Sequence, residues 1–267
     1  MVNSTLAKYA NLIRNISNWH LYFSRKFNVP YNKLVFHIRN KGISFTTPAK
    51  SLYLVFKEIF LADVYNMDQL AAALPEHPVV IDIGGNAGYF SLFLLSRKKQ
   101  ARIYAYEAIA ANCALFARHL DMNPPLKSMV QLHHKAVTGS PQATVTLHLE
   151  TPEENSVTAS VYNDFTKDNT YTAKVPCISL SEILFSNNLV KVDLVKVDCE
   201  GSEYPIIYET APQLWEKIDR MAIEVHNLDG EKRNVASLGA YLTSVGFTWN
   251  NYELENGCYM LFAGKRA

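Results

Sequence analysis

The chain has 267 residues, of which 48% are hydrophobic and 19% are charged, and its formal net charge is +1. This length and composition fit one large folded domain, with or without an appendage, and exclude a disordered tail, a collagen-like chain and a low-complexity chain. The four cysteines are widely spaced without a CxxC pair, which favours reduced thiols in the cytoplasm over a disulfide framework or a zinc site.

The first 75 residues are the basic part of the chain. They contain nine Lys or Arg and three acidic residues, a net charge of +6, whereas the remaining residues carry −5. Such a segment could attract an anionic substrate or carrier, but a solvated outer face is the simpler interpretation. No nucleic-acid-binding motif accompanies the charge, and charged residues interrupt every apolar run near the N-terminus. We therefore expect no nucleic-acid partner and no membrane span.

Helical spacing and turn residues predict four elements in this segment. They are an amphipathic helix over 6–16, a β-hairpin from 33–39 and 43–47, a helix over 51–65 and a short helix over 67–74. Asn40 and Gly42 tolerate the positive φ that the hairpin turn needs. We expect residues 1–75 to cap the domain that 76–267 forms.

After Pro78 the pattern becomes that of alternating strands and helices. Continuously apolar strands are predicted at 79–83, 102–107, 194–198 and 221–225, and helices at 89–96, 110–122, 180–185 and 236–245. Antiparallel pairs are predicted from 144–149 with 172–177 and from 248–254 with 258–264. This order indicates an α/β fold with a mostly parallel sheet. The polar stretch 151–169 has no period and is expected to be a mobile loop over the site.

The strongest local signal is a buried strand that enters the turn Gly84-Gly85-Asn86-Ala87-Gly88 and then a helix. Glu107 ends the next strand, 19 residues after Gly88, where a carboxylate can accept both hydroxyls of a ribose. Dinucleotides and S-adenosylmethionine share this geometry. Asp82 would oppose a pyrophosphate but suits the ammonium and sulfonium groups of S-adenosylmethionine, which we therefore favour over NAD.

Polar side chains also end two later strands. Asp198 and Glu200 follow one buried strand, and Glu224 and His226 lie two residues apart at the end of the next. Since ligands bind at the carboxyl ends of parallel strands, these four side chains are expected to face the glycine turn. Glu203 is assigned a structural role in the first turn of the following helix.

Together, DIGGNAG at 82–88, Glu107, KVDCEGSE at 196–203 and EVH at 224–226 resemble the FkbM family of S-adenosylmethionine-dependent methyltransferases. The resemblance covers about two thirds of the chain. The family more often has Ala at Gly85 and an aliphatic residue at Cys199. It implies a Rossmann-like class I methyltransferase, with a mostly parallel seven-stranded sheet whose last strand is antiparallel, behind an N-terminal helical and hairpin cap that selects the acceptor.

The resemblance also implies roles for individual residues. The residues expected to contact the cofactor are Asp82, Gly84, Gly85, Asn86, Gly88 and Tyr89 at the methionine end, Glu107 at the ribose, Ala136 and Val137 near the adenine, and Asp198 beside the methyl group. Ala136 and Val137 are expected to end a third strand of the sheet. The implied reaction is O-methylation of a hydroxyl on a sugar, a glycan or a natural product.

A hydroxyl acceptor needs a group that removes its proton. We expect His226 to act as the general base, oriented by Glu224, since an imidazole has an unperturbed pKa of about 6.5. The alternative is a divalent metal held by Asp198, Glu200, Glu224 and His226, a possible cofactor that ranks below the metal-free base.

Three other functions stay open at this level. A carboxylate acceptor, giving a methyl ester, would scarcely need a base. An NAD-dependent oxidoreductase fits the strand spacing, and a catalytically silent binding module fits the fold. The aromatic residues of the basic segment could stack on sugar rings or simply form a core. A homo-oligomer is possible.

Overall fold

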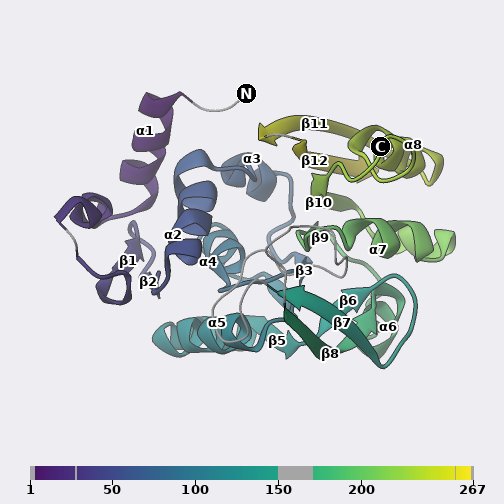
Figure 1. Ribbon diagram of the computed structural model, residues 1–267, viewed down its shortest axis with the longest axis horizontal. Helices are drawn as coiled ribbons and strands as arrows, with labels where there is room; N and C mark the ends of the chain where they lie inside the picture. The colour runs from purple at the N-terminus through teal and green to yellow at the C-terminus, as the bar shows by residue number, and fades with distance from the viewer. Residues whose placement is uncertain (1–3, 28, 150–170, 256, 266–267) are drawn as a thin grey trace.

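The computed structural model describes residues 4–27, 29–149, 171–255 and 257–265 (Figure 1). Its main sheet has seven strands in the order β11-β12-β10-β9-β3-β4-β5. These strands are β3 (Val79–Ile83), β4 (Arg102–Glu107), β5 (Val130–His134), β9 (Leu194–Val197), β10 (Arg220–His226), β11 (Phe247–Glu255) and β12 (Cys258–Lys265). The last strand, β12, runs antiparallel to β10 and β11, whereas the pairs from β10 to β5 are parallel. The expected Rossmann-like sheet is confirmed.

Helices cover both faces of this sheet. They are α4 (Tyr89–Leu95), α5 (Ala110–Met122), α6 (Leu180–Ser186), α7 (Glu203–Glu209) and α8 (Val235–Ser244), with the 3-10 helices η4 (Pro124–Met129) and η5 (Pro212–Lys217). Neighbouring strand residues face opposite sides, as the two-residue period of a strand requires. Val80 packs with α4, α5 and the N-terminal segment, whereas Ile81 and Ile83 pack with α6, α7 and α8. In Figure 1 these last three helices lie at the right.

The N-terminal segment forms the predicted helices and hairpin, but one predicted α-helix is partly a π-helix and two 3-10 helices were not predicted. Its elements are α1 (Thr5–Asn15), η1 (Trp19–Phe27), η2 (Tyr31–Lys33), β1 (Val35–Ile38), β2 (Ile43–Thr46), α2 (Lys50–Lys57), the π-helix η3 (Glu58–Ala62) and α3 (Met67–Ala72). The α-helix predicted over 51–65 ends at Lys57, and the wider π-helix continues to Ala62. Asp63 then ends the helical run with a left-handed φ of 52°.

This segment shares one hydrophobic core with the sheet. The rings of Phe45 and Phe60 stack at a centroid distance of 4.8 Å, and Phe60 contacts Phe93 of α4 at 4.6 Å. These aromatic contacts hold the N-terminal segment against α4, the helix that follows the glycine turn. The segment lies at the left of Figure 1.

A second, three-stranded sheet lies beside the main one. It consists of β6 (Ala136–Thr138), β7 (Thr144–Leu149) and β8 (Tyr171–Ser179). The expectation that Ala136 and Val137 end a strand of the main sheet is wrong, because β5 ends at His134 and both residues pair with β8 instead. The loop predicted over 151–169 lies outside the described residues. No helix among the described residues is long and apolar enough to cross a membrane.

Candidate active site

A cavity of about 550 Å³ lies at the carboxyl ends of the parallel strands, where α/β sheets bind their ligands. The expected site residues that line it are Gly84, Gly85, Asn86, Tyr89, Glu107, Ala136, Val137, Asp198, Glu200, Glu224 and His226. The described residues that line the cavity do not include Asp82 or Gly88. The N-terminal segment contributes Ser51, Leu54, Val55, Glu58, Ile59 and Tyr65.

The glycine turn is shaped by its contacts with neighbouring elements. Gly84 has a φ of 77°, and a Cβ there would lie 1.8 Å from the backbone oxygen of Asp198. Gly88 has a φ of 82°, and its Cβ would lie 2.3 Å from the ring of Phe116. Both positions therefore require glycine, and Gly88 serves the packing of α4 against α5 and makes no part of the cavity wall.

The side chain of Glu107 binds the backbone of the glycine turn. Its carboxylate accepts hydrogen bonds from the backbone N–H of Asn86 at 2.7 Å and of Ile109 at 2.8 Å. Burial raises the pKa of Glu107, and these two hydrogen bonds oppose the shift. A carboxylate has about four lone-pair sites, so Glu107 can accept further hydrogen bonds from a ligand in the cavity.

Asp82 does not face the cavity as expected. Its side chain is fully buried, where it accepts a hydrogen bond from Ser91 at 2.7 Å and lies 3.4 Å from Lys196 Nζ. Lys196 also donates to the carbonyls of Ile83 and Gly84 at 3.2 and 2.6 Å. The carboxylate of Asp82 therefore neutralises a buried lysine and is not available to a ligand's ammonium group.

Lys196 was missed as a site residue, although a lysine inside an apolar strand is a visible signal. It lines the cavity, and its Nζ lies 3.3 Å from the carboxylate of Asp198. Burial by itself lowers the pKa of a lysine, but the charges of Asp198 and Asp82 raise the pKa of Lys196 above its usual value. Asp198 also accepts a hydrogen bond from the Tyr65 hydroxyl at 2.8 Å, which ties the N-terminal segment to the site.

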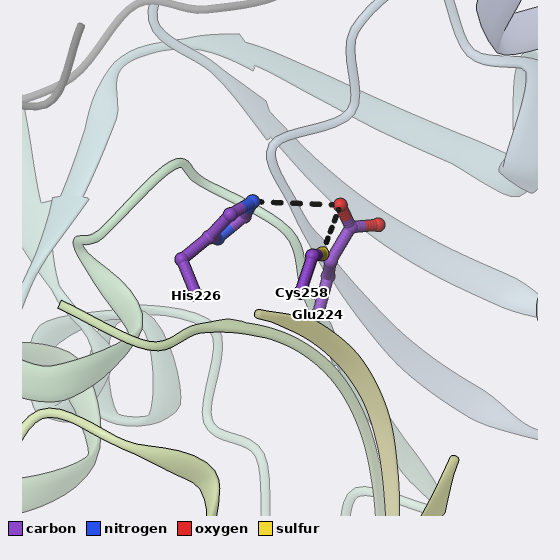
Figure 2. Close-up of side chains that lie close together, drawn as sticks. All are labelled: Glu224, His226 and Cys258. Carbon is purple, nitrogen blue, oxygen red and sulfur yellow. Dashed lines mark hydrogen bonds and ion pairs between the residues drawn. The ribbon is translucent and has the colours of Figure 1, made fainter. Parts of the chain in front are cut away.

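Three further side chains meet where β10 pairs with β12 (Figure 2). Glu224 and His226 lie two residues apart on β10 and so share a face, and Cys258 is the direct cross-strand partner of His226. Glu224 Oε1 lies 3.3 Å from Cys258 Sγ and 3.6 Å from His226 Nε2. Cys258 was not expected in the site, since its place depends on the register of the closing hairpin.

His226 has more carboxylate neighbours than Glu224 alone. Its Nε2 lies 3.3 Å from Glu200 Oε2, and its Nδ1 lies 3.3 Å from Glu203 Oε1. Glu203 is fully buried and also accepts from the backbone N–H of His226 at 2.9 Å and of Gly201 at 2.7 Å. Glu203, assigned only a helix role from the sequence, is therefore the residue that orients the imidazole.

The expected general-base role of His226 does not fit these surroundings. Burial by itself lowers the pKa of an imidazole, but hydrogen bonds to Cys258 and Glu203 and the charges of Glu203 and Glu200 raise the pKa of His226 to about 12. The carboxylates beside both ring nitrogens favour the protonated imidazole, which has no lone pair with which to accept a proton.

The pKa values of two carboxyl groups that line the cavity are raised as well. Burial, together with the charge of Asp198, raises the pKa of Glu58 to about 7. Burial also raises the pKa of Glu200 to about 8, against the opposing charge of His226. Glu200 has a left-handed φ of 47°, a strained backbone for a residue with a side chain and one that often marks a functional turn.

Comparisons with known proteins identify a family and relatives of this chain. Residues 82–249 match the family model for the methyltransferase FkbM domain. Methyltransferase 1 of Beauveria bassiana (strain ARSEF 2860) is 28% identical over 219 residues, which cover 76% of this chain and 84% of that protein. Methyltransferase sdnD of Sordaria araneosa is 24% identical over 207 residues, which cover 69% of this chain and 78% of that protein.

A solved structure of the METTL16 MTase domain has the same architecture. It superposes with a TM-score of 0.51 at 14% identity, covering 85% of this chain and 75% of that one. At this identity the likeness concerns the fold alone.

Proposed function

The chain belongs to the methyltransferase FkbM domain family, and we propose that it is an S-adenosylmethionine-dependent O-methyltransferase that acts on a hydroxyl of a sugar, a glycan or a natural product. One observation carries the proposal: a single cavity joins the glycine turn and Glu107 to the acidic ends of β9 and β10. The glycine turn and Glu107 suit a nucleoside. The acidic ends of β9 and β10 suit an acceptor that must lose a proton.

The cavity residues fit S-adenosylmethionine. Glu107 would hold the ribose, Ala136 and Val137 would lie near the adenine, and the turn at Gly84 and Gly85 would lie along the methionine end. When bound, this cofactor supplies an electrophilic methyl group on a positively charged sulfur. Six acidic side chains and two lysines are among the described residues that line the cavity, and this excess of hydrogen-bond acceptors over lysines favours the ammonium group of S-adenosylmethionine over the pyrophosphate of NAD.

The same acidic groups favour a hydroxyl acceptor over a carboxylate. Glu58, Asp198, Glu200 and Glu224 all line the cavity, and an ionised acceptor carboxylate would add to the repulsion among them. A neutral hydroxyl meets no such repulsion and gains hydrogen-bond acceptors.

We assign removal of the acceptor proton to Glu200 in place of His226. Asp198 is held by the cation of Lys196 and by the Tyr65 hydroxyl, which both weaken it as a base. Glu200 lies in the strained turn next to it and lines the cavity, and its carboxylate, which forms as the pH approaches 8, is a stronger base than an ordinary carboxylate. Glu200 Oε2 lies 3.3 Å from the ring of His226, whose orientation Glu203 sets from the other nitrogen.

The N-terminal segment is proposed to select the acceptor. Leu54, Val55 and Ile59 present apolar surface to the cavity, and Glu58 and Tyr65 present polar groups. We place the protein in the cytoplasm, since none of its four cysteines, all in described residues, forms a disulfide.

Calorimetric titration with S-adenosylmethionine and S-adenosylhomocysteine tests the cofactor. We expect the wild type to bind both and Glu107→Gln to bind them at least roughly tenfold more weakly, because the ribose hydroxyls lose a charged acceptor. Glu216→Gln, on the 3-10 helix η5, is the control. Binding of NAD in place of either ligand would overturn the proposal, and turnover assays with sugars and carboxylic acids then separate the two acceptor classes.

A further inference from the structure

The edge of the cavity formed by β10 and β12 brings together three kinds of metal-ligating atom. A carboxylate oxygen of Glu224, a ring nitrogen of His226 and the sulfur of Cys258 all lie within 4.8 Å of one another (Figure 2). All three residues line the cavity. An acidic surface patch does not offer this combination of nitrogen, oxygen and sulfur.

The spacing of these atoms matches a tetrahedral site. Bonds of about 2.0–2.3 Å from a tetrahedral metal to nitrogen, oxygen and sulfur place the ligand atoms roughly 3.3–3.8 Å from one another. Glu224 Oε1 lies 3.3 Å from Cys258 Sγ and 3.6 Å from His226 Nε2. Two edges of the tetrahedron are therefore present without movement of the backbone.

Metal-binding histidines usually have a carboxylate or carbonyl partner at the ring nitrogen that does not bind the metal, and Glu203 supplies it here. Its fully buried carboxylate lies 3.3 Å from His226 Nδ1, on the side of the ring away from Glu224 and Glu200. A carboxylate at Nδ1 keeps the proton on that nitrogen, and a metal at Nε2 takes the place of the proton that this nitrogen carries in the metal-free protein. Such a partner also makes the imidazole a stronger ligand.

The acidic groups around Glu224, His226 and Cys258 favour the binding of a cation. The lysine on this side of the cavity, Lys196, already lies between Asp82 and Asp198. Glu58, Glu200 and Glu224 add further acidic groups to the same wall. A divalent ion would offset this charge without displacing the lysine.

From this geometry we infer that Glu224, His226 and Cys258 bind a divalent transition metal, with Zn²⁺ preferred, and leave one coordination position open to the cavity. Mixed nitrogen, oxygen and sulfur ligands favour Zn²⁺ over Mg²⁺, which takes oxygen ligands in octahedral geometry. The site differs from the oxygen-rich one expected from the sequence, because Asp198 is engaged by Lys196 and Tyr65, and Cys258 joins instead.

The metal's role rests on the proposed function. The acceptor oxygen takes the open position, where the metal makes its proton more acidic. Glu200 accepts that proton, the oxygen forms a bond to the methyl carbon, and the carbon–sulfur bond breaks with its electron pair left on sulfur. The neutral thioether then leaves.

Cobalt binding tests the site without reference to turnover. The full chain, freed of metal by a chelator, is titrated with Co²⁺ alone, and absorption is followed. We expect one equivalent to bind with a thiolate-to-cobalt charge-transfer band, and Zn²⁺ to displace it. Cys258→Ala should lose the band, whereas Cys113→Ala, a cysteine of α5 that is also partly exposed, should keep it.

Glu203→Gln sharpens the test because it leaves all three ligands in place. Loss of the outer carboxylate should weaken the affinity for Co²⁺ by roughly 10- to 100-fold. If Cys258→Ala does not fold, Cys258→Ser takes its place and should lose the same band. Absence of stoichiometric Co²⁺ binding by the wild type, or a band that survives in either Cys258 variant, would overturn the inference.

Calorimetry on the same metal-free protein separates this inference from the proposed function. Binding of S-adenosylhomocysteine without binding of Co²⁺ overturns the metal site alone. Binding of Co²⁺ without binding of S-adenosylhomocysteine overturns the proposed methyltransferase activity and leaves the metal site standing.

Discussion

His119 on α5 is fully buried and His226 at the end of β10 is mostly buried, yet their surroundings are opposite. His119 Nδ1 lies 2.7 Å from the carbonyl oxygen of Ala87, and its Nε2 lies 3.0 Å from the backbone nitrogen of Thr46. Burial and the charge of Arg118 lower the pKa of His119 to about 4, against the hydrogen bond to Ala87. His226, in contrast, is surrounded by carboxylates that raise its pKa.

The difference shows how one residue type serves two purposes. A neutral imidazole has one donor and one acceptor, and His119 uses both to join α5 to the glycine turn and to the hairpin strand β2. A charged or metal-bound imidazole needs anionic neighbours, and the ends of β9 and β10 supply them around His226. The contacts of His119 join elements of the fold, whereas the cluster at His226 lines the cavity to which we assign the chemistry.

Replacement of Glu200 should have the largest effect on turnover and should leave the contacts of His119 with Thr46 and Ala87 intact. We expect Glu200→Gln to reduce turnover by roughly 10²- to 10⁴-fold, the usual contribution of a general base. Affinity for S-adenosylhomocysteine and the free energy of unfolding should change little. Glu231→Gln, on an exposed turn, is the control, and an equal loss of turnover in both variants would contradict the assignment.

Replacement of His119 should affect stability first. His119→Ala leaves the Thr46 N–H and the Ala87 carbonyl without their partner and opens a cavity, so we expect a loss of roughly 3–5 kcal/mol in the free energy of unfolding. Urea denaturation measures it. His37→Ala, at an exposed position of β1, should cost less than about 0.5 kcal/mol.

The pH dependence of stability should also report on His119. Its pKa is about 4 in the folded chain and 6.5 when unperturbed, so between these values the unfolded state binds a proton that the folded state does not. Stability from this group is complete above pH 6.5 and falls by up to about 3 kcal/mol as the pH drops to 4. Other acidic groups titrate in the same range, so the comparison is with His119→Ala, whose stability should fall less steeply. Parallel profiles would rule out a neutral His119.

The smallest effect is expected where the N-terminal segment touches the acidic cluster. Tyr65→Phe removes the hydroxyl that donates to Asp198, and we expect turnover to fall roughly threefold to tenfold. Tyr252→Phe is the matched control, because its hydroxyl donates to the carbonyl of Val64 and not to a site carboxylate. Equal effects in the two variants would show that the Tyr65 hydroxyl acts only through packing.

Much of the fold could be predicted because its signals are local. The strands β3 and β4 and helix α5 have the bounds that continuous apolar runs and helical spacing predict. The segment after Lys57 was predicted as an ordinary α-helix, since its apolar spacing does not reveal a π-helix. The short strand β5 has an alternating polar sequence and carried no clear signal of its own.

The site was predictable only in part. Glu107, Asp198, Glu200, Glu224 and His226 do line one cavity, because each lies near or just beyond the carboxyl end of a strand at the same edge of the sheet. Which charges neutralise one another was not predictable. Asp82 pairs with Lys196, more than a hundred residues further along the chain, and Glu203 reaches the ring of His226.

The sequence by itself determined the sheet, the glycine turn and the polar side chains at the ends of its strands, since strand and turn propensities act over a few residues. The tertiary structure decided the carboxylate surroundings of His226, the burial of Asp82 and the approach of Cys258 to Glu224. Electrostatic energies depend on distance and on exclusion of water, and both are fixed only when elements distant in the chain pack together.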